Sequence, residues 1–121
     1  MDAELDALAS HQTIGITTIG RNTGRPRRIE IWWFRVDGRF IITGTPGRRD
    51  WLANVKADPR IVVHVGRSDL EATASIVDDT ELRRTVFAQP QTSWYSSQAE
   101  LDHLVATAPM IEVHLVGAER A

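Results

Sequence analysis

Cysteine is absent from this 121-residue chain, so disulfide bonds and thiolate chemistry are excluded. Long apolar runs are absent too, and no segment approaches the roughly 18 residues that a membrane-spanning helix requires. The first residues, Met1–Asp6, are acidic and lack the basic-then-apolar order of a secretory signal peptide. Together these absences predict a cytoplasmic protein with no membrane span.

Recognisable catalytic and metal-binding motifs are also missing. The histidines are far apart in the sequence, and none lies in a His-x-x-x-His pattern; they are His11, His64, His103 and His114. There is no P-loop, no Gly-x-Ser-x-Gly elbow and no Gly-x-Gly-x-x-Gly fingerprint. We therefore predict no metal site, and we expect that a bound cofactor supplies the reactivity if the protein is an enzyme.

The net charge is small, −2, but it is unevenly distributed. The segment 20–67 contains 11 Lys and Arg residues against four Asp and Glu, whereas the remainder of the chain is acidic. Such a basic centre favours an anionic ligand. Nucleic acid is another anionic partner to consider, given the four tryptophans, but the negative total and the lack of a binding motif argue against it.

The length indicates a single domain, residues 1–121, with a modest core. Because small domains often extend their core by association, we expect a homodimer. Alternation of apolar and polar residues, with a strong hairpin signal at Asp37-Gly38, predicts six strands. The predicted strands are 13–19, 28–36, 39–44, 61–65, 70–77 and 110–116.

Short helices are expected between and around these strands. They are 2–10, 51–57 with Asp50 as N-cap, 80–88 capped by Thr80, and 99–106, with 89–97 irregular. The acidic pair Asp78-Asp79 suits the dipole at the start of the third helix. A closed antiparallel barrel and an α+β sandwich both fit these elements. The hairpin spacing favours the barrel, so we predict a mainly β (α+β) fold: a six-stranded antiparallel barrel with peripheral short helices.

Two segments combine glycines with arginines, the pattern of an anion site. In Thr17–Arg28 a turn exposes backbone N–H groups, and Arg27 and Arg28 follow on the next strand, pointing to opposite faces. In Gly44–Pro59 a flexible loop leads into a helix N-terminus, whose dipole favours an anion. Guanidinium groups bind phosphate or carboxylate through paired hydrogen bonds. We predict that the two segments meet in one cradle for a phosphate-bearing ligand.

The same segments resemble the deazaflavin-dependent nitroreductase family. The resemblance rests on 17–28, on the strand pair that follows, and on the run Trp51-Leu-Ala-Asn54-Val-Lys56-Ala-Asp-Pro59. It implies a split β-barrel related to the pyridoxamine 5'-phosphate oxidases. It also implies the cofactor F420, a deazaflavin with a phosphate and polyglutamate tail. The reaction it implies is hydride transfer from reduced F420 to a quinone, a nitro compound or an activated alkene.

The resemblance also implies site residues. The implied cofactor-binding residues are Asn22, Thr23, Arg27, Thr43, Gly44, Thr45, Gly47, Trp51 and Asn54. Among them, Arg27 would contact the phosphate and the tail carboxylates, and the loop from Thr43 to Gly47 would pass along the deazaflavin ring. Trp94 and Tyr95 correspond to the segment over the substrate, and the Tyr95 hydroxyl is the predicted catalytic donor.

Some features leave alternatives open. Asn22 stands where a basic residue is common in the family, and Pro46 lies near the position of a common lysine. FMN is an alternative cofactor, because it also carries a phosphate. A barrel that binds an anionic small molecule without catalysis is a further alternative. For Trp51, a role as a core anchor competes with a role at the cofactor.

Overall fold

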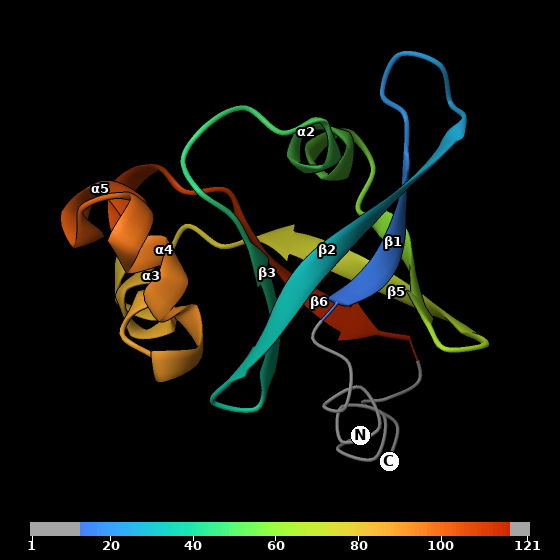
Figure 1. Ribbon diagram of the computed structural model, residues 1–121. Coiled ribbons are helices and arrows are strands. Elements are labelled where there is room, and N and C mark those ends of the chain that lie inside the picture. Colours follow the sequence, from blue (N-terminus) through green and yellow to red (C-terminus); the bar gives the residue numbers. More distant parts are fainter. Residues whose placement is uncertain (1–12, 117–121) are drawn as a thin grey trace.

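The computed structural model describes residues 13–116, which form a closed β-barrel with helices beside it and over one end (Figure 1). The strands are β1 (Thr13–Ile19), β2 (Pro26–Val36), β3 (Arg39–Thr43), β4 (Arg60–Val65), β5 (Ser68–Ile76) and β6 (Met110–Leu115). The helices are α2 (Asp50–Ala57), α3 (Thr80–Phe87), the 3-10 turn η1 (Pro90–Thr92), α4 (Ser93–Gln98) and α5 (Leu101–Thr107). The predicted helix 2–10 lies outside the described residues. Within 13–116, no helix has the length and apolar character needed to cross a membrane.

The strand order around the barrel is β1-β2-β3-β6-β5-β4, and every neighbouring pair is antiparallel. At the turn from β2 to β3, Asp37 and Gly38 have φ angles of 50° and 75°, the conformation that a two-residue hairpin turn requires. Strand β1 pairs with both β2 and β4, which closes the sheet and removes its free edges. The predicted six-stranded barrel is confirmed, and the sandwich alternative is wrong.

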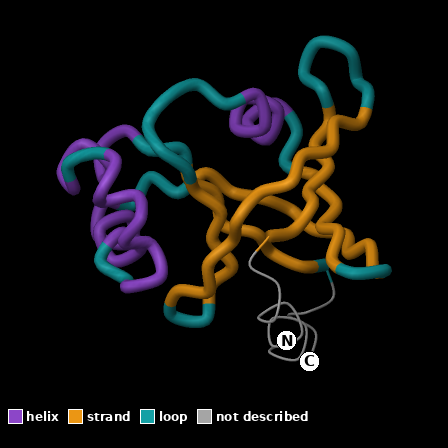
Figure 2. Tube along the Cα trace, in the orientation of Figure 1, coloured by secondary structure: helices purple, strands orange, loops and turns teal. Residues whose placement is uncertain are grey.

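Alternation along the strands produces two hydrophobic cores, one on each side of the barrel wall. The interior core includes Trp33 and Phe40, whose ring centroids lie 4.5 Å apart. The outer core lies between the barrel and helices α3 to α5, and includes Phe34 and Tyr95. Figure 2 shows these helices gathered on one side of the strands. Helix α2 covers one end of the barrel, where Trp51 joins the interior core.

The segment predicted to be irregular, 89–97, is helical from Pro90 onward. Pro90 begins the 3-10 turn η1, and α4 follows directly. The Thr92 hydroxyl donates a hydrogen bond to the Val86 carbonyl at 2.6 Å, which ties this turn to the end of α3. Burial of Tyr95 then fixes α4 against the outer core. The Ser- and aromatic-rich sequence has weak helix propensity, so tertiary packing decides the conformation here.

Two predicted helix caps are displaced by one residue. Helix α3 is capped by Asp79, whose carboxylate accepts hydrogen bonds from the backbone N–H groups of Glu81 and Leu82, and Thr80 is the first helical residue. Asp50 likewise begins α2 rather than capping it; the N-cap is Arg49, which makes no side-chain cap bond. The last predicted helix, 99–106, begins later, at Leu101, and ends at Thr107. The expected acidic start of α3 is confirmed.

A buried arginine holds the helical layer to the barrel. The Arg83 guanidinium donates hydrogen bonds to the carbonyls of Val105, Val77 and Ala108, at 2.5, 2.7 and 2.5 Å. These carbonyls belong to α5, to the end of β5 and to the connection into β6. Burial lowers the pKa of the guanidinium, an effect that the carboxylate of Asp78 partly opposes. One side chain thus satisfies three backbone acceptors that no regular element pairs.

Candidate functional site

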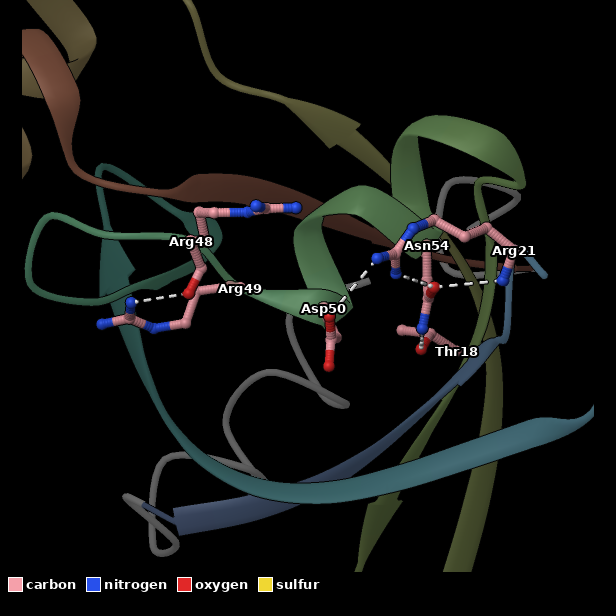
Figure 3. A network of polar contacts seen from close by, with 6 residues as sticks. All are labelled: Thr18, Arg21, Arg48, Arg49, Asp50 and Asn54. Carbon is pink, nitrogen blue, oxygen red and sulfur yellow. Dashed lines mark hydrogen bonds and ion pairs between the residues drawn. The ribbon is translucent and has the colours of Figure 1, made fainter. Parts of the chain in front are cut away.

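The turn between β1 and β2 meets helix α2. The predicted contact between the segments 17–28 and 44–59 is therefore present. Asn54 of α2, which is 3% exposed, makes the connection. Its Oδ1 accepts hydrogen bonds from the Arg21 backbone N–H at 3.1 Å and from Arg21 Nη1 at 3.0 Å, and its Nδ2 donates to Thr18 Oγ1 at 3.0 Å. Figure 3 shows Arg21 reaching over the helix towards Asn54 and Asp50. The hairpin turn and α2 therefore form one unit.

This arrangement assigns different tasks to the arginines of the hairpin. Arg21 is bound to Asn54 and, at 3.4 Å, to the exposed carboxylate of Asp50. Arg27 lies opposite Thr18 in the strand register, and directly opposed residues share a face of the sheet. Because Thr18 bonds to Asn54, Arg27 belongs to the face that carries α2. Arg28 lies on the other face, where it pairs with Glu30.

The turn itself is compact and depends on its first glycine. The N–H of Gly20 donates to the Arg25 carbonyl at 2.8 Å, and a Cβ on Gly20 would lie only 2.7 Å from Thr23 Oγ1. Thr23 Oγ1 also accepts the Arg25 N–H at 3.2 Å. Asn22 and Thr23 are exposed at the tip. Within residues 13–116, neither the Arg25 nor the Arg27 side chain has an ion-pair partner, so both guanidinium groups remain available to an anion.

The second predicted segment, the loop from Thr43 to Gly47, is organised around Arg49. Arg49 Nη2 donates to the Thr45 carbonyl at 2.9 Å and to Thr45 Oγ1 at 3.1 Å. A Cβ on Gly47 would lie 3.0 Å from Arg49 Nη1, and Gly47 has a φ of 139° that side chains disfavour. Thr43 donates its hydroxyl to the Pro109 carbonyl at 2.6 Å. The loop therefore closes around the Arg49 guanidinium. Among residues 13–116, no carboxylate forms an ion pair with this group.

The N-terminus of α2 is less open to an anion than the sequence suggested. Asp50, in the first turn, already places a carboxylate at the positive end of the helix dipole. Trp51 is buried and belongs to the interior core, so it anchors α2 to the barrel. Its contact with the cofactor stays a prediction. The positive charge at this end of the barrel comes from the arginines and not from the helix.

Aromatic side chains gather beside the loop that Arg49 organises. Tyr95 is 4% exposed, packed edge-on against Phe34 and Phe87. Trp94 is 50% exposed, with its ring centroid 5.9 Å from that of Trp32, itself 40% exposed. Trp32 was not among the predicted site residues. The sequence pair Trp32-Trp33 could have indicated its exposure. Adjacent residues of a strand face opposite sides of the sheet, so only one of the two indoles can enter the barrel interior.

The Tyr95 hydroxyl reaches solvent although the ring is buried. Every fully buried polar side-chain atom among residues 13–116 has a hydrogen-bond partner. The Tyr95 hydroxyl has no partner within these residues, so it is not fully buried and contacts water. Burial raises the pKa of the Tyr95 phenol above its ordinary value of 10.0, and the Arg49 guanidinium opposes that rise. The phenol is therefore neutral and able to donate a hydrogen bond at neutral pH.

A spectroscopic titration checks this environment directly, because Tyr95 is the single tyrosine of the chain. We expect the near-ultraviolet phenolate absorbance to appear at a pH above 10.0 in the folded protein and at the ordinary value in urea. A raised folded-state pKa means that the stability gained from the neutral phenol is present below pH 10.0 and is lost as the pH rises through the folded pKa. Identical titrations in both states would contradict this.

One sizeable cavity lies away from these residues. It has a volume of about 560 Å³, is open to solvent, and is lined by α2, α3, α5 and the end of β5. Its lining shares Gly47 with the predicted site but includes none of Arg27, Trp94 or Tyr95. The predicted site residues other than Gly47 therefore lie outside this cavity.

Comparison with known families decides the assignment of the chain. Residues 4–109 match the model of the F420H(2)-dependent quinone reductase family. The chain belongs to this family. It is a deazaflavin-dependent oxidoreductase, and F420 is its cofactor. The expected family resemblance and the expected cofactor are confirmed.

Solved structures support the fold. A structure described as an F420-H2 dependent reductase (FDR-A) is 22% identical, with a TM-score of 0.63 over 86% of this chain and 95% of that one. A structure described as a domain-swapped dimer has the same identity and TM-score over 86% and 81%. A putative pyridoxamine 5'-phosphate oxidase from Listeria innocua is 13% identical, with a TM-score of 0.71 over 95% and 92%. The split barrel of the pyridoxamine phosphate oxidases is therefore the fold.

The residues at this end of the barrel fit an F420 quinone reductase. F420 carries a phosphate and several carboxylates, and the exposed guanidinium groups of Arg25 and Arg27 have no protein anion to neutralise them among residues 13–116. The Arg49 guanidinium is a further cation at the loop expected to follow the ring.

Proposed function

We propose that the turn Gly20–Arg28 holds the phosphate and tail carboxylates of F420, with Arg27 as the principal contact. One observation carries this proposal. The Asn54 bridge brings the turn against α2 and employs Arg21, while it leaves Arg27 on the same face with a free guanidinium. Asn22 and Thr23, exposed at the tip, add polar groups beside it. A forked guanidinium suits both phosphate and carboxylate oxygens.

The loop Thr43–Gly47 is the proposed support of the deazaflavin ring. Gly44 and Gly47 lack side chains that would keep a planar ring at a distance. The closing bonds from Arg49 to Thr45 fix the loop conformation before any ligand binds. A preformed loop loses little conformational entropy on binding, which favours affinity. Asn54 and Trp51 act from beneath, by fixing α2.

The acceptor is proposed to lie against Trp94 and Trp32. When bound, reduced F420 supplies a hydride, and the chain supplies orientation, exclusion of water and a proton donor. The exposed indoles offer flat apolar faces, which suit a planar electron-poor molecule such as a quinone or a nitroaromatic. The Tyr95 hydroxyl, kept neutral by its buried ring, is the proposed hydrogen-bond donor to an oxygen of that acceptor.

A homodimer is the proposed assembly, and the cytoplasm stays the predicted location. The chain is short, and a relative of the same fold is described as a domain-swapped dimer. Association would bury further apolar surface on a domain whose own core is modest.

Substitution of Trp94 by alanine tests the acceptor site. We expect the KM for a naphthoquinone to rise about three- to tenfold, because loss of one aromatic contact costs roughly 0.5–1.5 kcal/mol. The affinity for F420 is expected to stay unchanged, since Trp94 is not placed at the cofactor. Steady-state kinetics and F420 titration measure the two quantities.

The matched control is Leu101→Ala, which removes an exposed apolar side chain from the neighbouring helix α5. It is expected to leave both constants as they are. An unchanged quinone KM in Trp94→Ala, or an equal rise in Leu101→Ala, would place the acceptor elsewhere.

A further inference from the structure

Three polar side chains form a hydrogen-bonded row on the outer face of the barrel, away from the Arg27 face. His64 of β4 lies between Asp69 of β5 and Thr17 of β1. Its Nδ1 is 2.7 Å from Asp69 Oδ1, and its Nε2 is 2.6 Å from Thr17 Oγ1. The strand register sets up the row, because His64 lies directly opposite Asp69 on one side and opposite Gly15 on the other.

The carboxylate determines how the protons are arranged. An ionised Asp69 only accepts hydrogen bonds, so Nδ1 of a neutral His64 carries the proton and donates it. The lone pair of Nε2 is then directed at the Thr17 hydroxyl, which donates to it. The His64 side chain is only 15% exposed, which keeps its ring in this orientation. A hydroxyl, an imidazole and a carboxylate in this order make up the arrangement that activates an oxygen nucleophile.

The strand beside Thr17 carries a cation on the same face of the sheet. Arg28 is the cross-strand neighbour of Thr17, and its guanidinium lies over Gly15. Arg28 Nη2 and Glu30 Oε2 each lie 2.9 Å from the position that a Cβ on Gly15 would occupy, so both groups rest on the bare backbone of that glycine. Glu30 accepts a hydrogen bond from Nε at 3.3 Å, and the two Nη groups have no acceptor within residues 13–116. They are free to bind a developing oxyanion.

A groove extends from Thr17 along the outer face. Its volume is about 320 Å³, enough for a small ligand, and its apolar lining includes Ile19 and Val62. Arg60 also lines it but is bound to Asp58 through two hydrogen bonds, at 3.0 and 2.7 Å. Glu71, on the same stretch of the wall, contributes an exposed carboxylate. The groove therefore combines apolar side chains beside the hydroxyl with a negative charge, which favours a neutral ligand over an anionic one.

We propose that Thr17 is the nucleophile of a second, hydrolytic site that cleaves carboxylic esters with short apolar acyl chains. Thr17 Oγ1 bonds to the ester carbonyl carbon while its proton passes to His64 Nε2. The carbon–alkoxy bond breaks, and the alcohol leaves with that proton. Water then attacks the acyl carbon, gives a proton to His64 and releases the carboxylic acid, and the proton returns to Thr17.

The roles within this site are distinct. Thr17 and His64 are the catalytic residues, Arg28 stabilises the oxyanion, and Asp69 is a positioning residue that sets the tautomer of His64. The acyl chain lies in the groove. The reaction requires only the ester and water, so it proceeds without F420 and does not depend on the proposed redox site.

The same face provides a natural comparison. Ser75 and His114 also form a hydroxyl–imidazole pair, but Ser75 Oγ and His114 Nε2 are 3.2 Å apart. Within residues 13–116 the other nitrogen of His114 has no carboxylate partner. A hydroxyl beside an imidazole without an orienting carboxylate is expected to be far less reactive. Ser75→Ala is therefore the matched control for Thr17→Val.

The test uses the full chain without F420. A fluorophosphonate probe is incubated with the protein, and intact and peptide mass spectra follow the label; hydrolysis of 4-nitrophenyl butyrate is measured in parallel. We expect one label per chain, on Thr17, with loss of fluoride. Labelling and hydrolysis are expected to fall about a hundredfold or more in Thr17→Val and His64→Gln, and to persist in Thr17→Ser and Ser75→Ala.

Each other outcome overturns the proposal. No label on the wild-type chain would show that the Thr17 hydroxyl is not activated. A label on another residue, or hydrolysis that continues unchanged in His64→Gln, would exclude the row as its cause. Because the wild-type label is itself decisive, the test does not depend on the folding of any variant.

Discussion

Replacement of Asn54 by leucine is expected to destabilise the protein by about 2–3 kcal/mol and to weaken F420 binding. The Asn54 side chain satisfies the buried Thr18 hydroxyl and the Arg21 backbone N–H, and leucine leaves both without a partner. An unsatisfied buried polar group costs roughly 1–3 kcal/mol. The turn also loses its attachment to α2, so the proposed phosphate site is no longer preformed. Urea denaturation and F420 titration measure the two effects.

The matched control for this prediction is Asp50→Asn. The Asp50 carboxylate is exposed and contacts Arg21 at 3.4 Å, so its loss is expected to cost less than about 1 kcal/mol. A stability of Asn54→Leu equal to that of the wild type would show that the bridge does not hold the hairpin. Equal losses in both variants would assign the effect to the ion pair instead.

The second large effect is expected from Arg83→Met. The substitution keeps much of the apolar stem but leaves the carbonyls of Val77, Val105 and Ala108 without donors. We expect a loss of roughly 3–5 kcal/mol in the free energy of unfolding, since several buried acceptors lose their partner together. The helical layer that carries Tyr95 loses its tie to the barrel at the same time. Chemical denaturation followed by circular dichroism gives the value.

Arg84→Met is the control for Arg83. Arg84 is the next residue of α3 and forms an exposed ion pair with Asp102 at 3.2 Å. Such surface pairs contribute roughly 0–1 kcal/mol. If the two variants are equally stable, the interior hydrogen bonds of Arg83 do not stabilise the fold as described.

Most of the barrel could be predicted from the sequence because its signals are local. Alternation along the strands and the turn at Asp37-Gly38 predicted all six strands, and each predicted end lies within two residues of the observed end. The conformation of α4 could not be predicted in this way. Its helix depends on contacts of Tyr95 with Phe34, which is distant in the sequence, and with Phe87 of the preceding helix α3.

In the candidate site, too, some features follow from the local sequence and others depend on tertiary contacts. The two glycine–arginine segments and their meeting were predicted from residue types. Which arginine is free was not, because it depends on the register that pairs Arg27 with Thr18 and on the hydrogen bonds that engage Arg21. The exposure of Trp32 and the row through His64 depend on neighbouring strands that only the closed sheet brings together.

The most direct test of the proposed Arg27–F420 contact is a titration of the wild type, Arg27→Gln and Arg67→Gln with F420, followed by tryptophan fluorescence. Arg67 is an exposed arginine at the turn before β5, away from the proposed site. We expect saturable quenching in the wild type and in Arg67→Gln. In Arg27→Gln the affinity is expected to be about ten- to a hundredfold weaker, the loss expected for one charge-assisted contact. Equal affinities in all three, or no quenching of the wild type, would contradict the Arg27–F420 contact.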